Sequence, residues 1–307
     1  MNRLTAPRRC LSVGAMDDAT PELRELAQTP APYRLVRPEN AITPVICASP
    51  HSGRIYPPEM MAASQLDRRA IRRSEDAHVD ELVAAAPAFG HTLIAAELAR
   101  AFIDVNREPW ELDPAMFEDE LPPFAKARTA RVAAGLGAIA RIVCEGQEIY
   151  SRKLTFAEAE ARVRGVHEPY HAALVALIAE TKAAQGVAVL IDWHSMPAAA
   201  STRAGESCDV VLGDRFGAAC SGAVTGLVER ELTAMGYRVA RNAPYAGGYT
   251  TEHYGRPGRK THALQIELSR ALYLDEATLK PTAGMARLKA DLARLFEALA
   301  AQDWSGL

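Results

Sequence analysis

Three residues with catalytic chemistry come shortly after apolar runs that are predicted to form buried strands. These are His51 after residues 45–48, His194 after residues 187–191 and Glu267 after residues 263–266. An α/β sheet binds its ligands beyond the carboxyl ends of its strands, so side chains delivered there are well placed for chemistry. Two imidazoles and a carboxylate at three strand ends are typical of a metal-dependent hydrolase.

The third ligand of such a metal would be a carboxylate. His51, Asp76 and His194 together can supply two imidazoles and one acid, with a fourth position left to water, as in carboxypeptidase A and thermolysin. The metal would lower the pKa of that water and polarise an amide carbonyl, while Glu267 moves the proton to the leaving nitrogen. The other interpretation of residues 74–76 is a serine cap followed by two acids at a helix start.

Other arrangements stay open on the residues alone. His167 and His171 are spaced i, i+4 on a predicted helix and could bind metal, although they flank an amphipathic core pattern. A nucleophilic Ser195 or Ser52 is a weaker hypothesis, because neither serine lies in a GxSxG elbow. Either of the strand-end histidines, taken singly, would more often be a hydrogen-bonded loop residue.

Arg107 follows a further predicted strand at residues 101–105. A fixed guanidinium at a strand end could hold a carboxylate through two hydrogen bonds. The alternative is a surface arginine paired with Glu108 or Glu111. Residues 112–150 are irregular and punctuated by proline and glycine, which is typical of lids and binding loops.

The remaining pattern alternates strands with helices. Predicted strands cover residues 43–48, 92–96, 101–105, 187–191, 209–213, 237–240 and 263–266. Predicted helices cover residues 66–73, 74–83, 157–182 with a break or a new first turn at Pro169, 218–235 and 279–302. This order favours a single-domain, three-layer α/β/α fold with a mixed, mostly parallel sheet.

The bulk properties exclude several classes of protein. With 35 basic and 38 acidic residues among 307, the net charge of −3 gives no reason to expect nucleic acid or a membrane surface as a partner. Five scattered cysteines without a CxxC motif favour a reducing, cytoplasmic compartment. Residues 1–40 are expected to be an N-terminal extension without a secretory signal, with Met16 as an alternative start, and residues 41–307 the catalytic domain.

Several short motifs, taken together and in order, resemble those of the N-formylglutamate amidohydrolase family, and the resemblance covers about residues 43–276. They are SPHSGR (49–54), EDAHVD (75–80), DVNR (104–107), DWHSM (192–196), GGYT (247–250), HYGRP (253–257) and QIE (265–267). That family is itself similar to the zinc carboxypeptidases, whose fold is a mixed sheet between helices. The resemblance implies His51 and His194 as metal ligands and Glu267 as catalytic base.

The resemblance also implies where the substrate is held. Asn106 and Arg107 match the carboxypeptidase element that grips a substrate carboxylate. The carboxypeptidases place their acidic ligand three residues after the first histidine, where this chain has Arg54, so Asp76 is the preferred third ligand and Glu75 the reserve. The other expected substrate-binding residues lie in the same motifs or next to them: Arg54, Ser195, Tyr249, His253, Arg256 and Arg270.

The activity implied is hydrolysis of N-formyl-L-glutamate to formate and L-glutamate, a step of bacterial histidine degradation. Zinc is the metal expected from the ligand types, although cobalt, manganese or iron would also suit them. Three alternatives remain: a deacylase of another N-acyl amino acid, a carboxypeptidase-like peptide hydrolase, and a metal-free binding protein of the same fold. The oligomeric state is not indicated.

Overall fold

The computed structural model describes residues 31–39, 42–143, 146–203 and 206–307, and one compact unit runs from Pro32 to Leu307. Residues 1–30, with the alternative start at Met16, lie outside the described residues. The first strand of the unit, β1 (Tyr33–Val36), already belongs to the main sheet. The sheet therefore begins before residue 41, inside the range expected to be an extension.

A seven-stranded sheet forms the centre of the described chain, in the order β1-β3-β2-β4-β9-β7-β8. The bounds of the strands after β1 are β2 Val45–Ser49, β3 Thr92–Ala96, β4 Ala188–Met196, β7 Val210–Gly213, β8 Val239–Arg241 and β9 Thr261–Ser269. The β1–β3 and β9–β7 pairs are antiparallel and the other pairs are parallel. The prediction of a mixed, mostly parallel sheet is confirmed.

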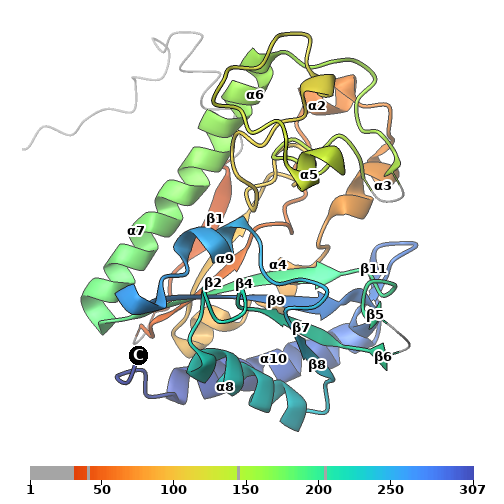
Figure 1. Cartoon of the computed structure of the whole chain (residues 1–307). Helices are drawn as coiled ribbons and strands as arrows, with labels where there is room; N and C mark the ends of the chain where they lie inside the picture. The colour runs from red at the N-terminus through yellow and green to blue at the C-terminus, as the bar shows by residue number, and fades with distance from the viewer. Residues whose placement is uncertain (1–30, 40–41, 144–145, 204–205) are drawn as a thin grey trace, which may run out of the picture. The chain divides into compact units, whose positions relative to one another are not determined.

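Helices cover both faces of this sheet, which gives the three predicted layers (Figure 1). On one face lie α7 (Glu168–Gln185) and α9 (Tyr249–Tyr254), and on the other α8 (Gly222–Ala234) and α10 (Gly284–Ala301). The α7 helix continues α6 (Phe156–Arg162) through one π-helical turn, Val163–His167. Of the two predictions for Pro169, a break or a new first turn, the structure has the second, because Pro169 lies in the first turn of α7. Shorter helices lie in the connections: α2 Pro58–Ala63, α3 Arg68–Ile71, α4 Val79–Leu82 and α5 Ala130–Ala133.

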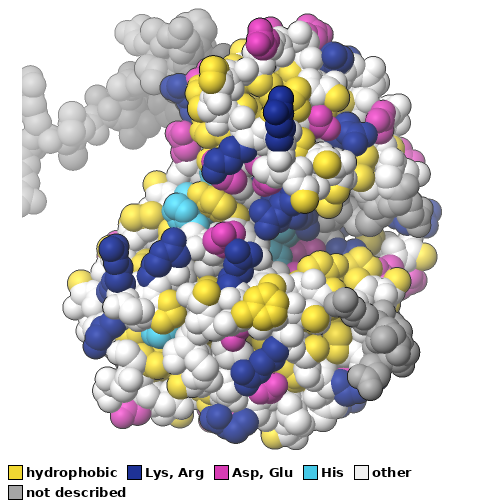
Figure 2. Space-filling view, viewed as in Figure 1, with side chains coloured by type: hydrophobic (Ala, Val, Ile, Leu, Met, Phe, Trp, Pro, Cys, Tyr) yellow, Lys and Arg dark blue, Asp and Glu magenta, His cyan; other side chains and the backbone are white. Residues whose placement is uncertain are grey.

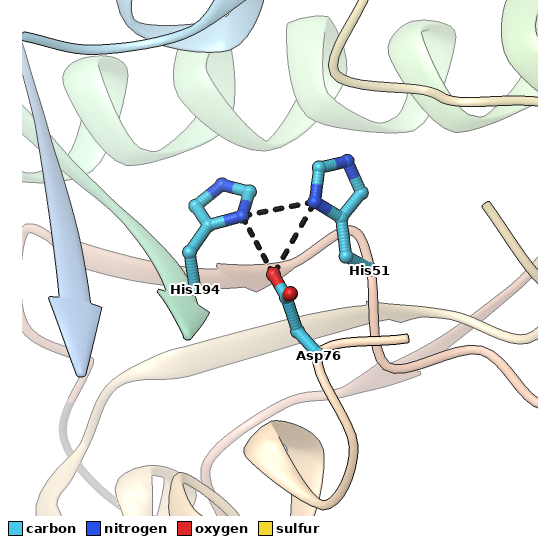
Figure 3. Close-up of side chains that lie close together, drawn as sticks. All are labelled: His51, Asp76 and His194. Atoms are coloured by element: carbon cyan, nitrogen blue, oxygen red, sulfur yellow. Dashed lines mark hydrogen bonds and ion pairs between the residues drawn. The ribbon is translucent and has the colours of Figure 1, made fainter. Parts of the chain in front are cut away.

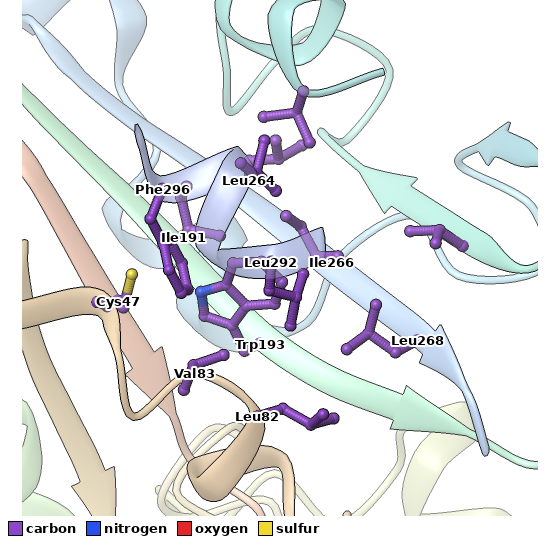
Figure 4. Close-up of a cluster of buried hydrophobic side chains, with 14 of the residues drawn as sticks. Cys47, Leu82, Val83, Ile191, Trp193, Leu264, Ile266, Leu268, Leu292 and Phe296 are labelled. Atoms are coloured by element: carbon purple, nitrogen blue, oxygen red, sulfur yellow. The ribbon is translucent and has the colours of Figure 1, made fainter. Parts of the chain in front are cut away.

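The core under α10 is built from alternate residues of the central strands. Ile191 and Trp193 of β4 and Ile266 of β9 point into it, and Trp193 meets Phe296 edge to face with ring centroids 5.8 Å apart (Figure 4). Successive strand residues point to opposite faces, so the residues between them face α7 and α9. The side chain of Leu190, for example, belongs to the separate core beneath α7.

Two elements differ from their prediction. Residues 101–105 form turns and irregular chain rather than a strand, because the Phe102 amide donates back to the Ala99 carbonyl and the Asp104 amide donates to the Ala138 carbonyl. The helix predicted from residue 74 begins only at Val79, with His78 in a left-handed conformation before it. Glu75 and Asp76 therefore lie in a loop and do not form a capped first turn.

Residues 107–143, here called the loop wall, have a small hydrophobic core of their own. Its members are Leu112, Met116, Phe117, Ala138 and Ile139, which pack with residues at the start of α6.

In the part of the chain that the structure describes, no helix combines the length and apolar character needed to cross a bilayer. The described cysteines, Cys47, Cys208 and Cys220, are not in disulfides.

Candidate active site

The alternation of β4 and β9 brings polar side chains together on the face that α7 and α9 cover. The two strands are parallel and paired in register, so that His194 lies beside Glu267 and Asp192 lies beside Gln265. Their neighbours Trp193 and Ile266 point into the opposite core. Because a strand alternates its side chains between two faces, burial of the apolar set on one face fixes a polar patch on the other.

His51 and Asp76 reach this patch from loops. His51 follows β2, and its carbonyl accepts a hydrogen bond of 3.0 Å from the Asp76 amide, which holds the two loops together. The Nδ1 atoms of His51 and His194 are 3.0 Å apart, and Oδ2 of Asp76 lies 3.3 Å and 3.0 Å from them (Figure 3). All three side chains are buried, and their ligand atoms converge on one point.

The spacing of these atoms fits a small divalent cation. Ligand atoms at ordinary zinc distances in a tetrahedral site are roughly 3.3 Å apart, close to the separations between His51, Asp76 and His194. The outer nitrogens also fit. Nε2 of His51 is 2.6 Å from Asp104 Oδ1, and Nε2 of His194 is 3.0 Å from Asp192 Oδ2.

With the hydrogen of each imidazole on Nε2, directed to its carboxylate, both Nδ1 lone pairs would face the Asp76 oxygen. Three electron pairs that converge without a proton between them require a cation, and carboxylate–histidine pairs of this kind orient metal-binding imidazoles in many proteins. The residues therefore fit a metal site, and His51, Asp76 and His194 are the only group of this kind among the described residues.

Asn106 ties this arrangement to α9. Its Nδ2 donates to Asp192 Oδ2 at 3.0 Å and lies 2.9 Å from Nε2 of His194, while its Oδ1 accepts from the Thr250 amide at 2.8 Å. Both ends of the Asn106 amide are thus engaged within the protein. These contacts fix the orientation of the Asn106 side chain, and its expected role in gripping a substrate carboxylate stays a prediction.

The electrostatics of the site favour a positive charge at its centre. Burial opposes the ionisation of Asp76, but its contacts with the His194 and His51 imidazoles hold the pKa of its carboxyl well below the usual range. Burial likewise acts against a charged His194, yet Asp192, Asp76 and Glu267 raise its pKa above the ordinary value. A proton or a metal cation would satisfy the same demand.

Glu267 is the carboxylate suited to proton transfer. Burial raises its pKa to about 7, with the charge of Asp76 adding to the effect and that of His194 opposing it. Its Oε1 accepts a hydrogen bond of 2.8 Å from Gln265 Nε2, which fixes the orientation of the carboxyl group. A base with a pKa near neutrality is matched to general acid–base work.

These residues open into a cavity of about 540 Å³ whose other side is the loop wall. Lys and Arg side chains gather around the hollow in Figure 2, and the arginines that line it are Arg73, Arg100, Arg107, Arg131 and Arg270. Arg100 donates to Asp104 at 2.7 Å, and Arg270 donates to Asp76 at 3.2 Å and to Ser195 Oγ at 3.1 Å.

Arg107 and Arg131 come to the cavity from the loop wall. Burial lowers the pKa of Arg107, and the nearby charges of Arg100 and Arg131 lower it further, against the opposite effect of Asp104. Arg131 lies 3.8 Å from Glu111. Guanidinium groups crowded in this way attract an anion, which would relieve their mutual repulsion.

Four expected substrate-binding residues do not line the cavity. Arg54 points away and pairs with Asp80 and Glu81 on the surface, so its place in the motif does not bring it to the site. Tyr249 and His253 stack on each other within α9, and Arg256 donates to backbone carbonyls at the end of that helix. Asn106, Arg107, Ser195 and Arg270 do line it.

The alternatives from the sequence are separated by the same contacts. Glu75, the reserve ligand, is buried but binds Arg72 and the Tyr56 hydroxyl, away from the two histidines. Ser195 Oγ accepts from Arg270, and Ser52 is hydrogen-bonded to Ser49. Among the hydrogen bonds of the described residues, neither serine is paired with a histidine that could activate it.

His167 and His171 are not arranged as metal ligands. With Glu168 they have the spacing of an HExxH motif, but their rings are stacked with centroids 4.2 Å apart. His171 uses both nitrogens, one to the Tyr254 hydroxyl at 2.7 Å and one to the Val105 carbonyl at 2.7 Å.

The sequence patterns do not identify the whole site. They assign no role to Arg100, and they include Asp104, Asp192 and Gln265 only as parts of motifs. For Asp192 and Gln265 a signal exists, since they lie two residues before His194 and Glu267 and so on the same strand face. For Arg100 there is none.

Comparison with known proteins places the chain in a class. The sequence model of the N-formylglutamate amidohydrolase family matches residues 43–274, and the chain belongs to this family. A crystal structure of N-formylglutamate amidohydrolase from Ralstonia eutropha JMP134 superimposes with a TM-score of 0.85 at 38% identity, over 90% of this chain and 100% of that one.

Two curated relatives carry a more particular name. N-formylglutamate deformylase from Pseudomonas aeruginosa is 29% identical over 249 residues, which are 76% of this chain and 83% of the relative. N-formylglutamate deformylase from Pseudomonas putida is 27% identical over 248 residues, 76% of this chain and 82% of the relative.

Proposed function

We propose that this protein is a metal-dependent hydrolase that converts N-formyl-L-glutamate to formate and L-glutamate. The observation that carries the proposal is the convergence of His51, Asp76 and His194 beside Glu267, at the floor of an arginine-lined cavity. Membership of the N-formylglutamate amidohydrolase family and the names of the relatives supply the substrate.

The metal is assigned to His51, Asp76 and His194, and zinc is the ion that two imidazoles and a carboxylate suit well. When bound, it would polarise the formyl carbonyl and lower the pKa of a water molecule toward neutrality. Asp104 and Asp192 orient the two imidazoles through their outer nitrogens.

Glu267 is assigned as the general base and acid. Its carboxylate accepts the proton of the attacking water and then donates that proton to the amide nitrogen, which leaves as the amine of glutamate. Gln265 keeps the carboxylate in place through its hydrogen bond to Oε1. The strand pairing of Glu267 with His194 keeps the base next to the ligand cluster.

The arginines are assigned to the two carboxylates of the substrate. Arg107 and Arg131, on the loop wall, have only long contacts with Asp104 (3.9 Å) and Glu111 (3.8 Å), so we place one substrate carboxylate against them. Arg270 is already hydrogen-bonded to Asp76 and Ser195, and its assigned role is to support them rather than to bind substrate alone. We assign no contact with the substrate to the four residues that lie outside the cavity, Arg54, Tyr249, His253 and Arg256.

A wider substrate range is the main alternative, because Leu136, Ile142 and Val143 add an apolar surface to the same cavity. Such a surface would accept an acyl group larger than formyl.

The compartment proposed for the enzyme is the cytoplasm, on the basis of its cysteine usage.

The test is release of formate from N-formyl-L-glutamate by the full-length protein, before and after removal of metal with a chelator and after adding zinc back. Activity that disappears and returns supports the proposal. The matched control is Glu267→Gln, which should bind zinc as the wild type does but release little formate. Release of acetate or succinate as well as formate would establish the wider range, and release of either without formate would refute the assigned substrate.

A further inference from the structure

His167 and His171 hold the backbone on either side of Asn106. Nε2 of His171 is 2.7 Å from the carbonyl oxygen of Val105, and Nε2 of His167 is 2.9 Å from that of Arg107. A carbonyl oxygen can only accept, so both Nε2 atoms carry the hydrogen. The two imidazoles therefore donate to the carbonyl groups of the residues before and after Asn106.

Residues 104–107, which these two histidines hold, contact the outer ring nitrogens of His51 and His194. Asp104 binds Nε2 of His51, and Asn106 lies against Nε2 of His194 and donates to its partner Asp192. The backbone N–H of Asn106 also donates to Asp104 Oδ1 at 2.8 Å. A shift of this short segment would disturb the outer contacts of both imidazoles together.

The two histidines are themselves rigidly placed. Their rings stack with centroids 4.2 Å apart, and His171 Nδ1 accepts from the Tyr254 hydroxyl at 2.7 Å, which joins α7 to α9. His167 is the last residue of the π-helical turn that joins α6 to α7. Such a turn inserts an extra residue and re-aims the side chains that follow, and it is often found at functional sites.

We propose that His167 and His171 are positioning residues for the metal centre, acting through Asp104, Asn106 and Arg107. The inference rests on the proposed metal site and adds to it a pair of histidines that do not touch the metal. Their HExxH spacing thus lets two imidazoles of one helical stretch hold the same loop, and each imidazole donates to a backbone carbonyl of that loop.

A purely structural role is the competing explanation, since any buried, hydrogen-bonded histidine stabilises a fold. His91 provides the matched control. It is fully buried, its Nε2 is 2.9 Å from the Phe296 carbonyl oxygen and its Nδ1 is 2.6 Å from Thr43 Oγ1, yet it does not line the cavity or touch the ligand network. Its loss removes the same kinds of contact at a place remote from the metal.

The experiment measures zinc affinity of the full-length protein by competition with a chromophoric chelator. The variants are His167→Leu, His171→Leu, His171→Gln and His91→Leu. Loss of an outer contact typically weakens metal binding about 10- to 100-fold, and we expect roughly 10-fold weaker zinc binding for the two leucine variants at positions 167 and 171. His171→Gln retains a donor for the Val105 carbonyl and should recover most of the affinity.

The control should behave differently. His91→Leu should lower the melting temperature but leave zinc affinity within about twofold of wild type, because distant sites act independently. Zinc affinity that is unchanged in His167→Leu and His171→Leu, or reduced equally in His91→Leu, would overturn the positioning role. A wild-type protein that binds no zinc would instead refute the proposed metal site itself.

Kinetics at saturating zinc give a second readout. His167 holds the carbonyl of Arg107, so His167→Leu should raise KM for N-formyl-L-glutamate more than His171→Leu does, with both variants folded by circular dichroism. Equal KM values for the two variants and the wild type would contradict the part of the inference that concerns Arg107.

Discussion

Replacing Gly248 by alanine should damage the site through a single contact. A Cβ atom at this position would lie 2.7 Å from Asn106 Nδ2, 2.8 Å from its Oδ1 and 2.9 Å from its Cγ. The backbone of Gly248 is extended, with φ −87°, so alanine causes no conformational strain of its own. The whole effect therefore comes from the displacement of the Asn106 side chain.

The size of the effect follows from these distances. Ordinary van der Waals contact begins at 3.4 Å, so the amide must move by about 0.7 Å from its place. Its hydrogen bonds to Asp192 and the Thr250 amide, now 3.0 Å and 2.8 Å long, would then be lost or badly stretched. Overpacking and two weakened hydrogen bonds together cost about 2–4 kcal/mol of unfolding free energy.

Two assays measure this change. Urea denaturation gives the loss of stability, and formate release at saturating zinc gives the loss of activity, expected to be about 10- to 100-fold for a disturbed outer contact of a metal ligand. Gly222→Ala is the matched control, because a Cβ there meets nothing within 4 Å and the residue begins α8. A Gly248→Ala protein as stable and as active as Gly222→Ala would refute the reasoning.

Three further predictions concern the base, the anion site and a buried histidine. Glu267→Gln should lower kcat by about 10²- to 10⁴-fold with zinc affinity retained, as steady-state kinetics and metal titration would show. Arg107→Ala should raise KM far more than kcat falls; comparable small effects from both substitutions would contradict the assigned roles. Burial lowers the pKa of His91 to about 4, below its unfolded value near 6.5, so the unfolded chain binds the extra proton first. Unfolding free energy should therefore fall by up to roughly 3 kcal/mol between pH 6.5 and pH 4, and urea denaturation of His91→Gln should show a smaller decrease.

The sheet and the proposed metal site can be predicted because both rest on local patterns. Apolar runs mark the central strands, and the histidines that follow two of these runs indicate two residues of the group that could hold a metal. The choice between Glu75 and Asp76 cannot be made in the same way. It depends on an extended loop backbone that turns the two neighbouring acids in opposite directions, toward Arg72 and toward His194.

The substrate-binding residues are harder to predict because their side chains are long. Arg54 lies only three residues after His51, yet Asp80 and Glu81 compete for its guanidinium and draw it to the surface. Conversely, nothing near Arg100 in the sequence indicates a site, and its place depends on Asp104 four residues later. The direction of such a long side chain depends on the carboxylates that lie near it in the folded protein.

The cavity is assembled from two stretches of chain, the second of which has a small core of its own besides its contacts with the core beneath α7. The ligands and the base come from the sheet and its adjoining loops, whereas Arg107, Arg131 and the apolar lining come from the loop wall, which packs around its own core of Leu112 and Ile139. Residues 107–143 could therefore be redesigned, or exchanged for the equivalent stretch of a relative, without repacking β4 and β9. Selectivity among acylated amino acids is in this sense a transplantable property, carried by a stretch of chain that supplies neither the ligand cluster nor the base.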